Sequence, residues 1–409
     1  MTERNEQKKI LVTGATGNVG RNVVSLLTEA GHTPRVLVRD PRSARLPAGV
    51  EVAVGDLTEP GSLDAALEGV ESVFLLWPFV TAEGAEPVVE AIAKHSRQVV
   101  YLSAFSVRDD AEPAENGVWG QVERLIERSG VRWTFLRAGG FAANTLGWAG
   151  QIRDTGVVRA PYAGAARSLI HEADIAAVAA SALTEDGHDG RRYLLTGPEV
   201  LTQAEQVRLI GAAIGRELRF DEQPREEARE QMVAAWGAPE FVDQALDHWA
   251  RIVDEPEPVV PTVREVTGRP ARTFLEWARD HAADFRNVRD VADAYAGAFL
   301  RGSLEEAMAL LAEDIVRVAP LEGGGELHGP RAIVENAGRL TADYDIHGVD
   351  VEGPFVAGDR FAIKFTFDEL HRPTGQRTNT TKMSLYTVSG GRIVREEVYY
   401  FDRPQAVLR

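Results

Sequence analysis

The chain has 409 residues, more than one compact core holds, so its length predicts two or three folded units. The composition, 44% hydrophobic and 26% charged, is that of a soluble globular protein, and no apolar run approaches the roughly 20 residues of a membrane helix. A formal charge of −17 opposes phosphate backbones and argues against general nucleic-acid binding. We therefore expect a small-molecule substrate, with no nucleic-acid partner and no membrane.

The absence of cysteine limits the chemistry that the protein can perform, and the polar N-terminus indicates where in the cell it is expected. Without cysteine the chain has no disulfide, no thiolate nucleophile and no cysteine-based metal site, and we predict no metal site. Residues 1–9 are polar and lead straight into a strand, so they lack the apolar core of a signal peptide. The expected location is cytoplasmic.

Residues 9–140 alternate short β-branched runs with helical patterns. Strands are expected at residues 9–14, 33–40, 50–56, 72–77, 98–105 and 132–140, with helices at 62–70, 85–96 and 120–130. Strands that are separated by helices run parallel and are joined by right-handed crossovers. The pattern predicts an α/β Rossmann domain with a doubly wound parallel sheet.

The first strand leads into a glycine loop, "ILVTGATGNVGRNVV" at residues 10–24. Gly14 permits a tight turn, Gly17 lets backbone N–H groups approach a pyrophosphate, and Gly20 lets helix and strand pack closely. The strand, the loop and the helix together are the context that such a motif needs. The predicted cofactor-binding loop comprises Gly14, Thr16, Gly17, Asn18, Val19 and Gly20.

The end of the second strand indicates which dinucleotide binds. Arg39 lies 19 residues after Gly20, near the place where an NAD-binding protein carries a carboxylate for the ribose. A guanidinium there can bind a 2′-phosphate, which favours NADP(H), although Asp40 keeps NAD as an alternative and Arg39 could be an ordinary solvated arginine. Asp56, with Leu57 beside it, follows the third strand and could bind the adenine or simply form a turn.

Residues 141–285 continue with helices and short extended pieces. In an open α/β sheet a ligand lies outside the carboxyl ends of the strands, so this region is expected to cover the cofactor and to shape the substrate pocket. A Pro-rich, charged connection at residues 254–274 leads into a predicted helix at 273–285. The predicted domains are therefore residues 1–286 and 287–409.

The pattern changes after residue 286. Two amphipathic helices are expected within residues 288–318, a short helix at 331–340, and then four or five alternating strands. Helices followed by a run of antiparallel strands predict a separate α+β domain.

The N-terminal motifs resemble the NmrA-like branch of the atypical short-chain dehydrogenase/reductases. The resemblance covers residues 8–286 and rests on "VTGATGNVGRNVV", "VLVRDP", "VAVGDL", "ERSGVRWTFLRAGGFAANT", the stretch that begins "HEADIAAVAASALTEDG", and "VTGRPARTFLEWARDHAADF". It implies a Rossmann fold that prefers NADP. It also implies either reduction of small molecules or binding of the nucleotide as a redox sensor without turnover.

The catalytic pair of that superfamily is missing. Its enzymes generally use a tyrosine as proton donor and a lysine four residues later, and Trp119 and Glu123 occupy the matching positions. Ser103 occupies the position of a helper hydroxyl that also borders the cofactor. Each residue also has an ordinary interpretation: Trp119 as a packing residue, Glu123 as a surface carboxylate and Ser103 as a hydrogen-bonded strand end. The loss of the pair weakens the prediction of a reductase without excluding it.

The C-terminal motifs resemble the SnoaL-like group of the NTF2-like superfamily. The order of "LLAEDI", "LHGPRAI" and "GGRIVREE" carries the resemblance over residues 287–405. It implies a cone-shaped α+β fold, a curved sheet around an apolar pocket, and a homodimer. Relatives include polyketide cyclases, isomerases, hydratases and dehydratases, as well as binders without catalysis.

Those reactions need a carboxylate or a histidine in an apolar pocket. Alternation places Glu396 on one strand face with Val394, Val398 and Tyr400, as a candidate acid or base; the alternatives are the opposite register and a salt-bridged structural glutamate. Further candidates are Glu369, which shares a face with Phe361, Ile363, Phe365 and Phe367, and His371, which is expected at the pocket mouth.

Two further positions relate to the isomerase branch of the superfamily. Tyr295 matches a pocket tyrosine of that branch and could donate a hydrogen bond. Ala319 stands where that branch has its aspartate base, which argues against isomerisation by that base. His328 is interpreted as a loop histidine.

The leading hypothesis is an enzyme of specialised metabolism, such as polyketide or antibiotic biosynthesis. An NADPH-dependent reductase domain and a SnoaL-like domain would act on one polyketide-like or similar small molecule. The alternatives are an NADP(H)-sensing binding protein whose C-terminal domain binds a ligand or dimerises, and a chain in which only the SnoaL-like domain is catalytic.

Overall fold

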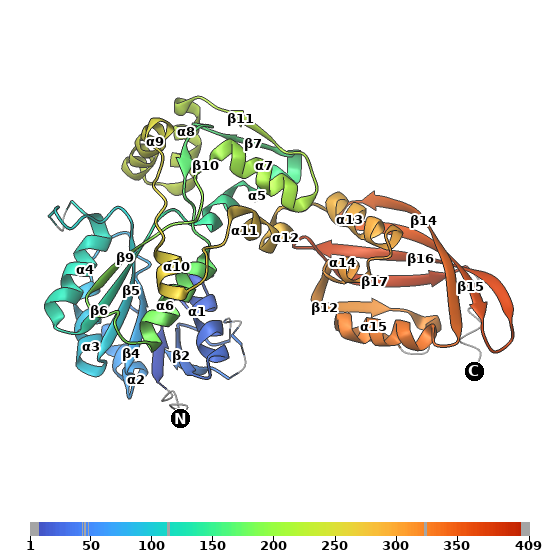
Figure 1. Ribbon diagram of the computed structural model, residues 1–409, viewed down its shortest axis with the longest axis horizontal. Helices are drawn as coiled ribbons and strands as arrows, with labels where there is room; N and C mark the ends of the chain where they lie inside the picture. Colours follow the sequence, from blue (N-terminus) through green and yellow to red (C-terminus); the bar gives the residue numbers. More distant parts are fainter. Residues whose placement is uncertain are drawn as a thin grey trace. The chain divides into compact units, whose positions relative to one another are not determined.

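The computed structural model describes residues 8–42, 44, 46–47, 49–112, 115–322 and 325–401. These residues form two compact units, each made of three chain segments (Figure 1). The first unit comprises Met1–Thr145, Ala160–Gln206 and Glu222–Trp277, and the second comprises Leu146–Arg159, Val207–Asp221 and Ala278–Arg409.

The first unit is built on a parallel sheet. Its seven described strands lie in the order β3-β2-β1-β4-β5-β6-β9, and all neighbours pair in parallel. The order reverses between β1 and β4, which creates a crevice outside the carboxyl ends of these strands. The predicted doubly wound α/β fold is confirmed. The strands are β1 (Lys9–Val12), β2 (Thr33–Val38), β3 (Glu51–Val54), β4 (Ser72–Leu76), β5 (Gln98–Ala104), β6 (Arg132–Ala138) and β9 (Arg191–Leu195).

Helices cover both faces of this sheet (Figure 1). Successive residues of a strand point to opposite faces, so Ile10 and Val12 enter one hydrophobic core and Leu11 enters the other. The first core is closed by α1 (Asn18–Glu29), α6 (Glu172–Thr184) and α10 (Thr262–Thr267), and the second by α2 (Leu63–Leu67), α3 (Ala85–His95) and α4 (Gly117–Ser129).

Shorter elements complete the first unit. They are β8 (Ala166–Arg167), which pairs with β10 (Leu201–Thr202), the helices α8 (Arg225–Trp236) and α9 (Pro239–Asp254), and the first four residues of α11 (Phe274–Asp280). The helix expected at residues 273–285 is interrupted. The backbone N–H of Asp284 bonds to the carbonyl of His281, so a new helix, α12 (Ala282–Phe285), begins after a turn.

The second unit takes two segments from the middle of the chain. They hold α5 (Ala149–Thr155), most of α7 (Gln203–Ile214), and most of the paired strands β7 (Val157–Ala160) and β11 (Arg219–Glu222). Polar contacts attach both segments to the C-terminal residues: Asn287 Nδ2 donates to the Arg153 carbonyl at 3.0 Å, and Arg216 pairs with Asp290 at 3.3 Å. The boundary near residue 286 stays a prediction.

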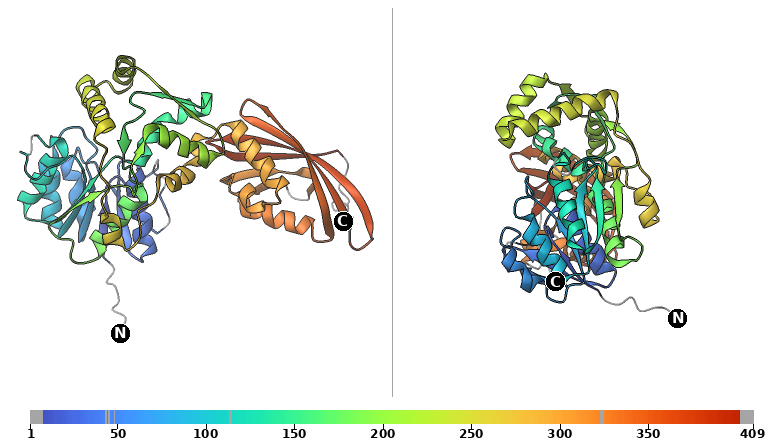
Figure 2. Two further views of the ribbon diagram at one scale, coloured as in Figure 1. Left: turned by 45° about the horizontal axis from the view of Figure 1, so that its top comes forward. Right: turned by 90° about the vertical axis from the view of Figure 1, so that its left-hand side faces the viewer.

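The C-terminal residues form a mixed sheet with helices on one face (Figure 2). The strands, in the spatial order β13-β12-β17-β16-β15-β14, are β12 (Leu311–Val318), β13 (Glu326–His328), β14 (Tyr344–Ala357), β15 (Arg360–His371), β16 (Gln376–Ser389) and β17 (Arg392–Tyr400). The helices are α13 (Val288–Leu300), α14 (Leu304–Met308) and α15 (Gly329–Leu340). The expected α+β fold is confirmed, with β14–β17 as the antiparallel run.

One helix is shorter than its pattern indicated. The second helix expected within residues 288–318 ends at Met308, and residues 311–318 form β12, which pairs in parallel with β17. The β-branched residues Ile315, Val316 and Val318 favour a strand there. None of the helices in the described ranges combines the length and the apolar character that crossing a membrane requires.

Candidate functional site

The loop between β1 and α1 has a backbone conformation that favours glycine. Gly14 has a φ of +64°, and a Cβ atom on Gly20 would lie 2.2 Å from the Gly14 carbonyl oxygen. The backbone N–H of Gly17 donates to the same oxygen at 2.9 Å and closes the turn. The loop therefore brings the first turn of α1 close to the carboxyl end of β1.

The start of α1 fits a pyrophosphate group. Gly17 is the N-cap residue, and it has no side chain with which to cap the first backbone N–H groups of the helix. Thr16, Gly17 and Asn18 are exposed, whereas Val19 is buried and offers only its backbone N–H. The predicted loop residues could thus hold a dinucleotide through their backbone, and Gly20 gives the close packing that the loop requires.

Arg39 and Asp40 follow β2 and differ in their surroundings. The Asp40 carboxylate accepts hydrogen bonds from the backbone N–H of Arg42 at 3.0 Å and from its Nε at 3.3 Å. Arg39 is exposed, and its positive charge contributes to the lowered pKa of Asp56. Because Asp40 is engaged and Arg39 is accessible, the geometry fits a 2′-phosphate better than a ribose hydroxyl at this position. The role of Arg39 stays a prediction.

Asp56 forms the turn that the sequence offered as its ordinary role. Its Oδ1 accepts hydrogen bonds from the backbone N–H and the hydroxyl of Thr58, each at 2.9 Å. These bonds lower the pKa of Asp56. Leu57 is half-buried against the core that α2 closes. A contact of either residue with the adenine stays a prediction.

A cavity of about 630 Å³ opens at the carboxyl ends of β4, β5 and β6. Its lining includes Ser103 on β5, Trp119 at the start of α4, and Phe141 after β6. Residues 248, 251, 252 and 255–258, at the end of α9 and beyond it, also line the cavity. The region expected to shape a substrate pocket therefore lines this cavity, and neither Trp119 nor Phe141 fills the space.

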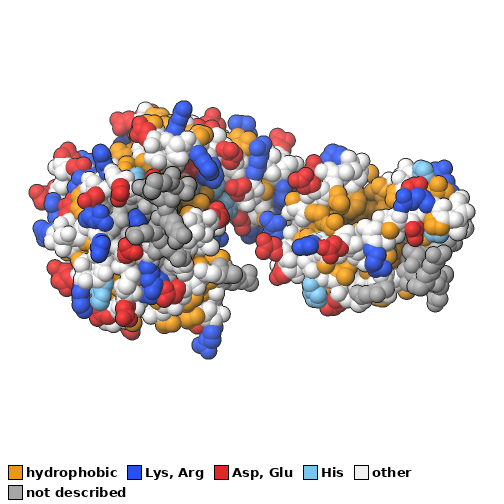
Figure 3. All heavy atoms as spheres, turned by 60° about the horizontal axis from the view of Figure 1, so that its bottom comes forward, with side chains coloured by type: hydrophobic (Ala, Val, Ile, Leu, Met, Phe, Trp, Pro, Cys, Tyr) orange, Lys and Arg blue, Asp and Glu red, His pale blue; other side chains and the backbone are white. Residues whose placement is uncertain are grey.

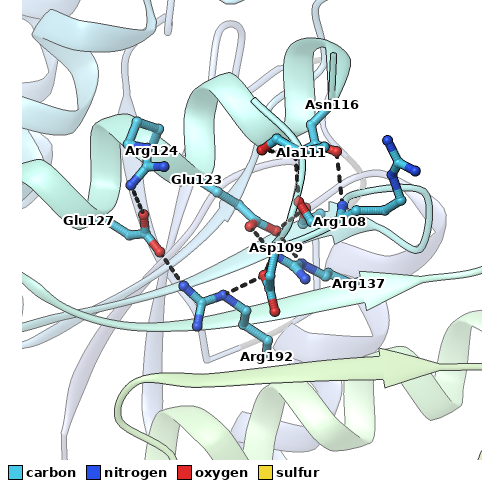
Figure 4. A network of polar contacts seen from close by, with 10 residues as sticks. Arg108, Asp109, Ala111, Asn116, Glu123, Arg124, Glu127, Arg137 and Arg192 are labelled. Atoms are coloured by element: carbon cyan, nitrogen blue, oxygen red, sulfur yellow. Dashed lines mark hydrogen bonds and ion pairs between the residues drawn. The ribbon is translucent and has the colours of Figure 1, made fainter. Parts of the chain in front are cut away.

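Glu123 is not the surface carboxylate that the sequence offered as its ordinary role, since only 4% of it is exposed. Figure 4 shows its carboxylate directed at Arg137. It accepts hydrogen bonds from Arg137 Nε at 3.0 Å and Nη2 at 2.6 Å, and from the Ser103 hydroxyl at 2.6 Å. Asp109 accepts from the same guanidinium at 2.8 Å. A buried ion pair thus occupies the position of the family's lysine, because Arg137 on the neighbouring strand compensates the charge.

This ion pair determines what Ser103 can offer to a ligand. Its hydroxyl proton is directed to Glu123, so its lone pairs face the cavity as hydrogen-bond acceptors. Trp119, 38% exposed, also lines the cavity, and its indole N–H can donate a hydrogen bond but is no acid at neutral pH. Both residues are placed to orient a ligand, and their catalytic roles stay predictions.

A second cavity, of about 440 Å³, lies in the second unit between the mixed sheet and helices α13, α14 and α15. Figure 3 shows hydrophobic side chains gathered on the surface of this unit. The apolar part of the lining includes Phe299, Leu304, Met308, Ile333, Val334, Phe365 and Phe367. The polar part includes Arg317, Glu322, Glu369, Thr380, Lys382, Tyr386, Glu396 and Tyr400.

Arg317 binds two buried carboxylates in this cavity. Its Nη2 donates to Glu322 at 2.8 Å and its Nε donates to Glu396 at 2.9 Å, and no member of the cluster is more than 6% exposed. Burial by itself raises the pKa of Glu322, but the Arg317 guanidinium outweighs burial, and the pKa falls below its ordinary value. One guanidinium therefore binds both buried carboxylates, and it keeps Glu322 ionised.

The alternation of β17 placed Glu396 correctly on the inner face of the sheet. Besides Arg317, it accepts hydrogen bonds from the Ser384 hydroxyl at 2.9 Å and the Tyr386 hydroxyl at 3.4 Å. Tyr295 packs against Tyr386 with ring centroids 4.9 Å apart, and burial raises the pKa of Tyr295, which keeps its phenol protonated. The salt-bridged alternative for Glu396 is present in the structure, and catalytic roles for Glu396 and Tyr295 stay predictions.

The remaining candidates divide between the cavity and its surroundings. Glu369 lines the cavity and accepts a hydrogen bond from the Thr380 hydroxyl. His371 was expected at the pocket mouth, but it is not among the described residues that line the cavity. It bonds to the Thr374 hydroxyl at 2.8 Å, because it begins the tight turn after β15. His328 is exposed at the start of α15.

The sequence interpretation missed Arg317, Glu322 and Lys382. Arg317 lies two residues after the buried Ile315 on β12, so alternation could have shown that it faces inward. A buried arginine requires anionic partners, which would have directed attention to nearby glutamates. Glu322 belongs to a short 3-10 helix, Pro320–Glu322, where no periodic pattern indicates its direction.

Comparison with known families agrees with both parts of this architecture. A family model described as the NmrA-like family matches residues 6–284. The chain belongs to the NmrA-like family. A second model, described as a SnoaL-like domain, matches residues 291–396. Both resemblances are confirmed, and the NmrA-like part is an atypical short-chain dehydrogenase/reductase that lacks the tyrosine and lysine pair.

Named relatives share the NmrA-like part. The chain is 41% identical over 283 residues to a (4-alkanoyl-5-oxo-2,5-dihydrofuran-3-yl)methyl phosphate reductase from Streptomyces griseus, covering 68% of this chain and 99% of that protein. It is 39% identical over 284 residues to an NAD(P)H azoreductase from Xenophilus azovorans, with the same coverage of 68% and 99%. A solved structure of an NADPH-dependent quinone oxidoreductase from Escherichia coli, complexed with NADPH, has 23% identity and a TM-score of 0.57, over 66% of this chain and 99% of that one. This structural likeness supports the fold.

The lowered pKa of Glu322 predicts a specific pH dependence of stability in the SnoaL-like domain. The ion pair contributes fully above the pKa of an unfolded glutamate, about 4.5, and its contribution is lost as the pH falls through the lower folded pKa. We expect Glu322→Gln to lower the free energy of unfolding at pH 7 by about 3 kcal/mol, because it removes one partner of a buried pair. The difference from the wild type should shrink steadily below pH 4.5.

Hydrogen exchange of β12 and β17 at matched pH values measures this difference in the full chain. Glu335→Gln is the control, because Glu335 pairs with Arg331 on the exposed surface of α15. Glu335→Gln should lower the free energy of unfolding by less than about 1 kcal/mol. Equal losses for the two variants at pH 7, or a difference for Glu322→Gln that does not change with pH, would contradict the assignment.

Proposed function

We propose that the chain is an NADPH-dependent reductase of a polyketide-like or other small specialised metabolite, fused to a cyclase-, isomerase- or dehydratase-type SnoaL-like domain. The observation that carries the reductase proposal is the cavity of about 630 Å³ at the carboxyl ends of β4, β5 and β6, beside the strand reversal where the glycine loop lies. A reduced nicotinamide held by that loop would reach such a cavity in an open α/β sheet.

The relatives support reduction of a conjugated acceptor. Their names describe reduction of an alkanoyl-dihydrofuranone phosphate and of azo compounds. Both substrates contain π systems that accept a hydride at one atom and a proton at another. The sensing alternative receives no comparable support from relatives at 41% and 39% identity.

The catalytic work of this site is mainly orientation. The cofactor would supply a hydride, and the backbone of the glycine loop and Arg39 would bind its phosphates. Ser103 would accept a hydrogen bond from the cofactor or the substrate, because its own hydroxyl proton is already donated in the hydrogen bond to Glu123. Trp119 and Phe141 would exclude water from the reacting face. Without an acidic tyrosine, the proton would come from solvent.

The second cavity supports a reaction or a specific binding event in the SnoaL-like domain. Its volume of about 440 Å³ suits a small metabolite, and it combines apolar walls with inward-facing carboxylates. Glu396 would act as the acid or base, with Ser384 and Tyr386 fixing its direction. Tyr295 would donate a hydrogen bond to a developing oxyanion through its protonated phenol.

A direct assay tests the proposed reduction. The full chain is titrated with NADPH and then incubated with a panel of conjugated ketones, quinones, butenolides and an azo compound, while the absorbance of the reduced nicotinamide is recorded. We expect NADPH to bind and to be consumed only in the presence of an acceptor. Failure to bind NADPH, or binding without consumption by any member of the panel, would contradict the proposal.

Arg39→Ala tests the preference for the phosphorylated cofactor. The variant should bind NADPH about 10-fold to 100-fold more weakly, because a charge-assisted bidentate contact is lost, with little change for NADH. Calorimetric titration with both cofactors measures the ratio. Arg132→Ala is a matched control, because Arg132 is exposed at the first residue of β6, away from the carboxyl ends of the strands. An equal loss of affinity for NADPH and for NADH would exclude Arg39 from the 2′-phosphate site.

Glu396→Gln tests the chemistry of the SnoaL-like domain. The carboxamide keeps the shape of the side chain but cannot exchange a proton, so a substrate should still gain two hydrogen atoms from reduction but fail to cyclise, isomerise or lose water. Mass spectrometry and chromatography of the products separate these steps, and the expected loss in the second step is about 100-fold or more. An unchanged second step in a correctly folded variant would exclude Glu396 as its acid or base.

A further inference from the structure

Lysine is rare in this chain, and one lysine lies in the second cavity. Only five of the 45 basic Lys and Arg residues are lysines. Four of them contact oxygen atoms: Lys8 donates to the Thr184 carbonyl, and Lys9, Lys94 and Lys364 pair with the carboxylates of Glu51, Asp64 and Glu352. The fifth, Lys382, lines the cavity of the SnoaL-like domain.

The surroundings of Lys382 are unlike those of the other lysines. Its Nζ lies 5.3 Å from the ring centroid of Phe367 and 5.9 Å from that of Phe365. Among the residues that the structure describes, it makes no ion pair, since Glu322 and Glu396 are engaged by Arg317 and Glu369 accepts from a threonine. The amine therefore lies beside two aromatic rings, on a residue that lines the cavity.

The register of the sheet fixes this position. Lys382 on β16 pairs with Phe365 on β15 and with Tyr400 on β17. Alternation places Thr380, Ser384 and Tyr386 on the same inner face, where Tyr386 and Ser384 are fully buried. Lys382 thus projects from the middle of a rigid strand and not from a mobile loop.

The choice of lysine over arginine has a chemical consequence. The chain uses arginine for its buried ion pairs, as at Arg137 and Arg317, and an arginine remains protonated. A lysine can lose its proton and become a nucleophile. Burial lowers the pKa of Lys382, and Arg317 lowers it further, against the opposing effect of Glu396, Glu322 and Glu369. A larger fraction of the amine is therefore neutral than for a surface lysine.

We propose that Lys382 is a nucleophile that captures an aldehyde or ketone in this cavity as an iminium ion. The neutral amine attacks the carbonyl carbon to form a carbon–nitrogen bond, and the carbonyl oxygen leaves as water. Overall, the ammonium form and the carbonyl compound give the iminium and one water molecule, so no oxidant, reductant or further proton is needed. The positive charge is the same before and after capture.

The cavity favours this product. The rings of Phe365 and Phe367 stabilise a cation at the nitrogen, and the carboxylates of Glu322, Glu369 and Glu396 line the same space. The apolar walls and the volume of about 440 Å³ select an aldehyde or ketone on a small apolar or ring-containing skeleton. An iminium acidifies the adjacent carbon–hydrogen bond, which would prepare the captured compound for carbon–carbon bond formation or loss of water. This site is independent of NADPH and of the proposed reduction.

Reductive trapping tests the inference. The full chain, without NADPH, is treated with 2-naphthaldehyde and sodium cyanoborohydride, which reduces an iminium to a stable secondary amine. Intact-mass measurement and peptide mapping then give the rate of adduct formation at each lysine. Lys382 should react at least about tenfold faster than the other four, because burial in the cavity leaves a larger fraction of its amine neutral and able to attack the aldehyde.

Three variants make the result decisive. Lys382→Met and Lys382→Arg should both lose the fast adduct, and Lys382→Arg keeps the positive charge that the fold has at this position. Lys364→Met is the matched control, because Lys364 lies on the neighbouring strand β15 and pairs with Glu352; it should keep the fast adduct. Reaction of Lys382 no faster than Lys364, or a fast adduct that persists in Lys382→Arg, would overturn the inference. Either result would leave the NADPH assay unaffected.

Discussion

Buried guanidinium groups determine where the carboxylates of both candidate sites can lie. Arg137 holds Glu123 in the first unit, and Arg317 holds Glu396 in the second, with every one of these side chains at most 8% exposed. A charge removed from water without a partner costs several kcal/mol, so neither carboxylate could occupy its position without its cation. The same pairing directs nearby hydroxyl groups. Ser103 points its proton at Glu123, and this orientation decides which of its atoms a ligand meets.

Local sequence patterns were sufficient to predict most of the fold. The strands of the parallel sheet and the glycine loop depend on β-branched runs, helix spacing and a turn that favours glycine, all within short stretches of chain. The same is true of the inward face of β17, where alternation alone placed Glu396. The errors also have local causes. Residues 311–318 were included in a helical region because the apolar residues before them recur every three or four residues, as in an amphipathic helix. The pairing with β17 instead makes them a strand.

The candidate sites were less predictable because their contacts join distant parts of the chain. Glu123 occupies a position of its helix that the sequence pattern allows to be exposed. Its carboxylate can be buried only because Arg137, on a neighbouring strand, pairs with it. Lys382 lies in a polar stretch of β16 in which Thr380 and Ser384 also face inward. Alternation was therefore no guide there, since neither face of that stretch is distinctly apolar in the sequence.

The division of the chain into units has a consequence for dissecting the protein. Each unit consists of three segments, and these alternate along the sequence. One backbone cut near residue 286 would leave Arg216 and Arg153 on a different fragment from their partners Asp290 and Asn287. A fragment that begins there would lack helices that belong to its own compact unit. Isolating either half intact would therefore require a circularly rearranged or split gene rather than a simple truncation.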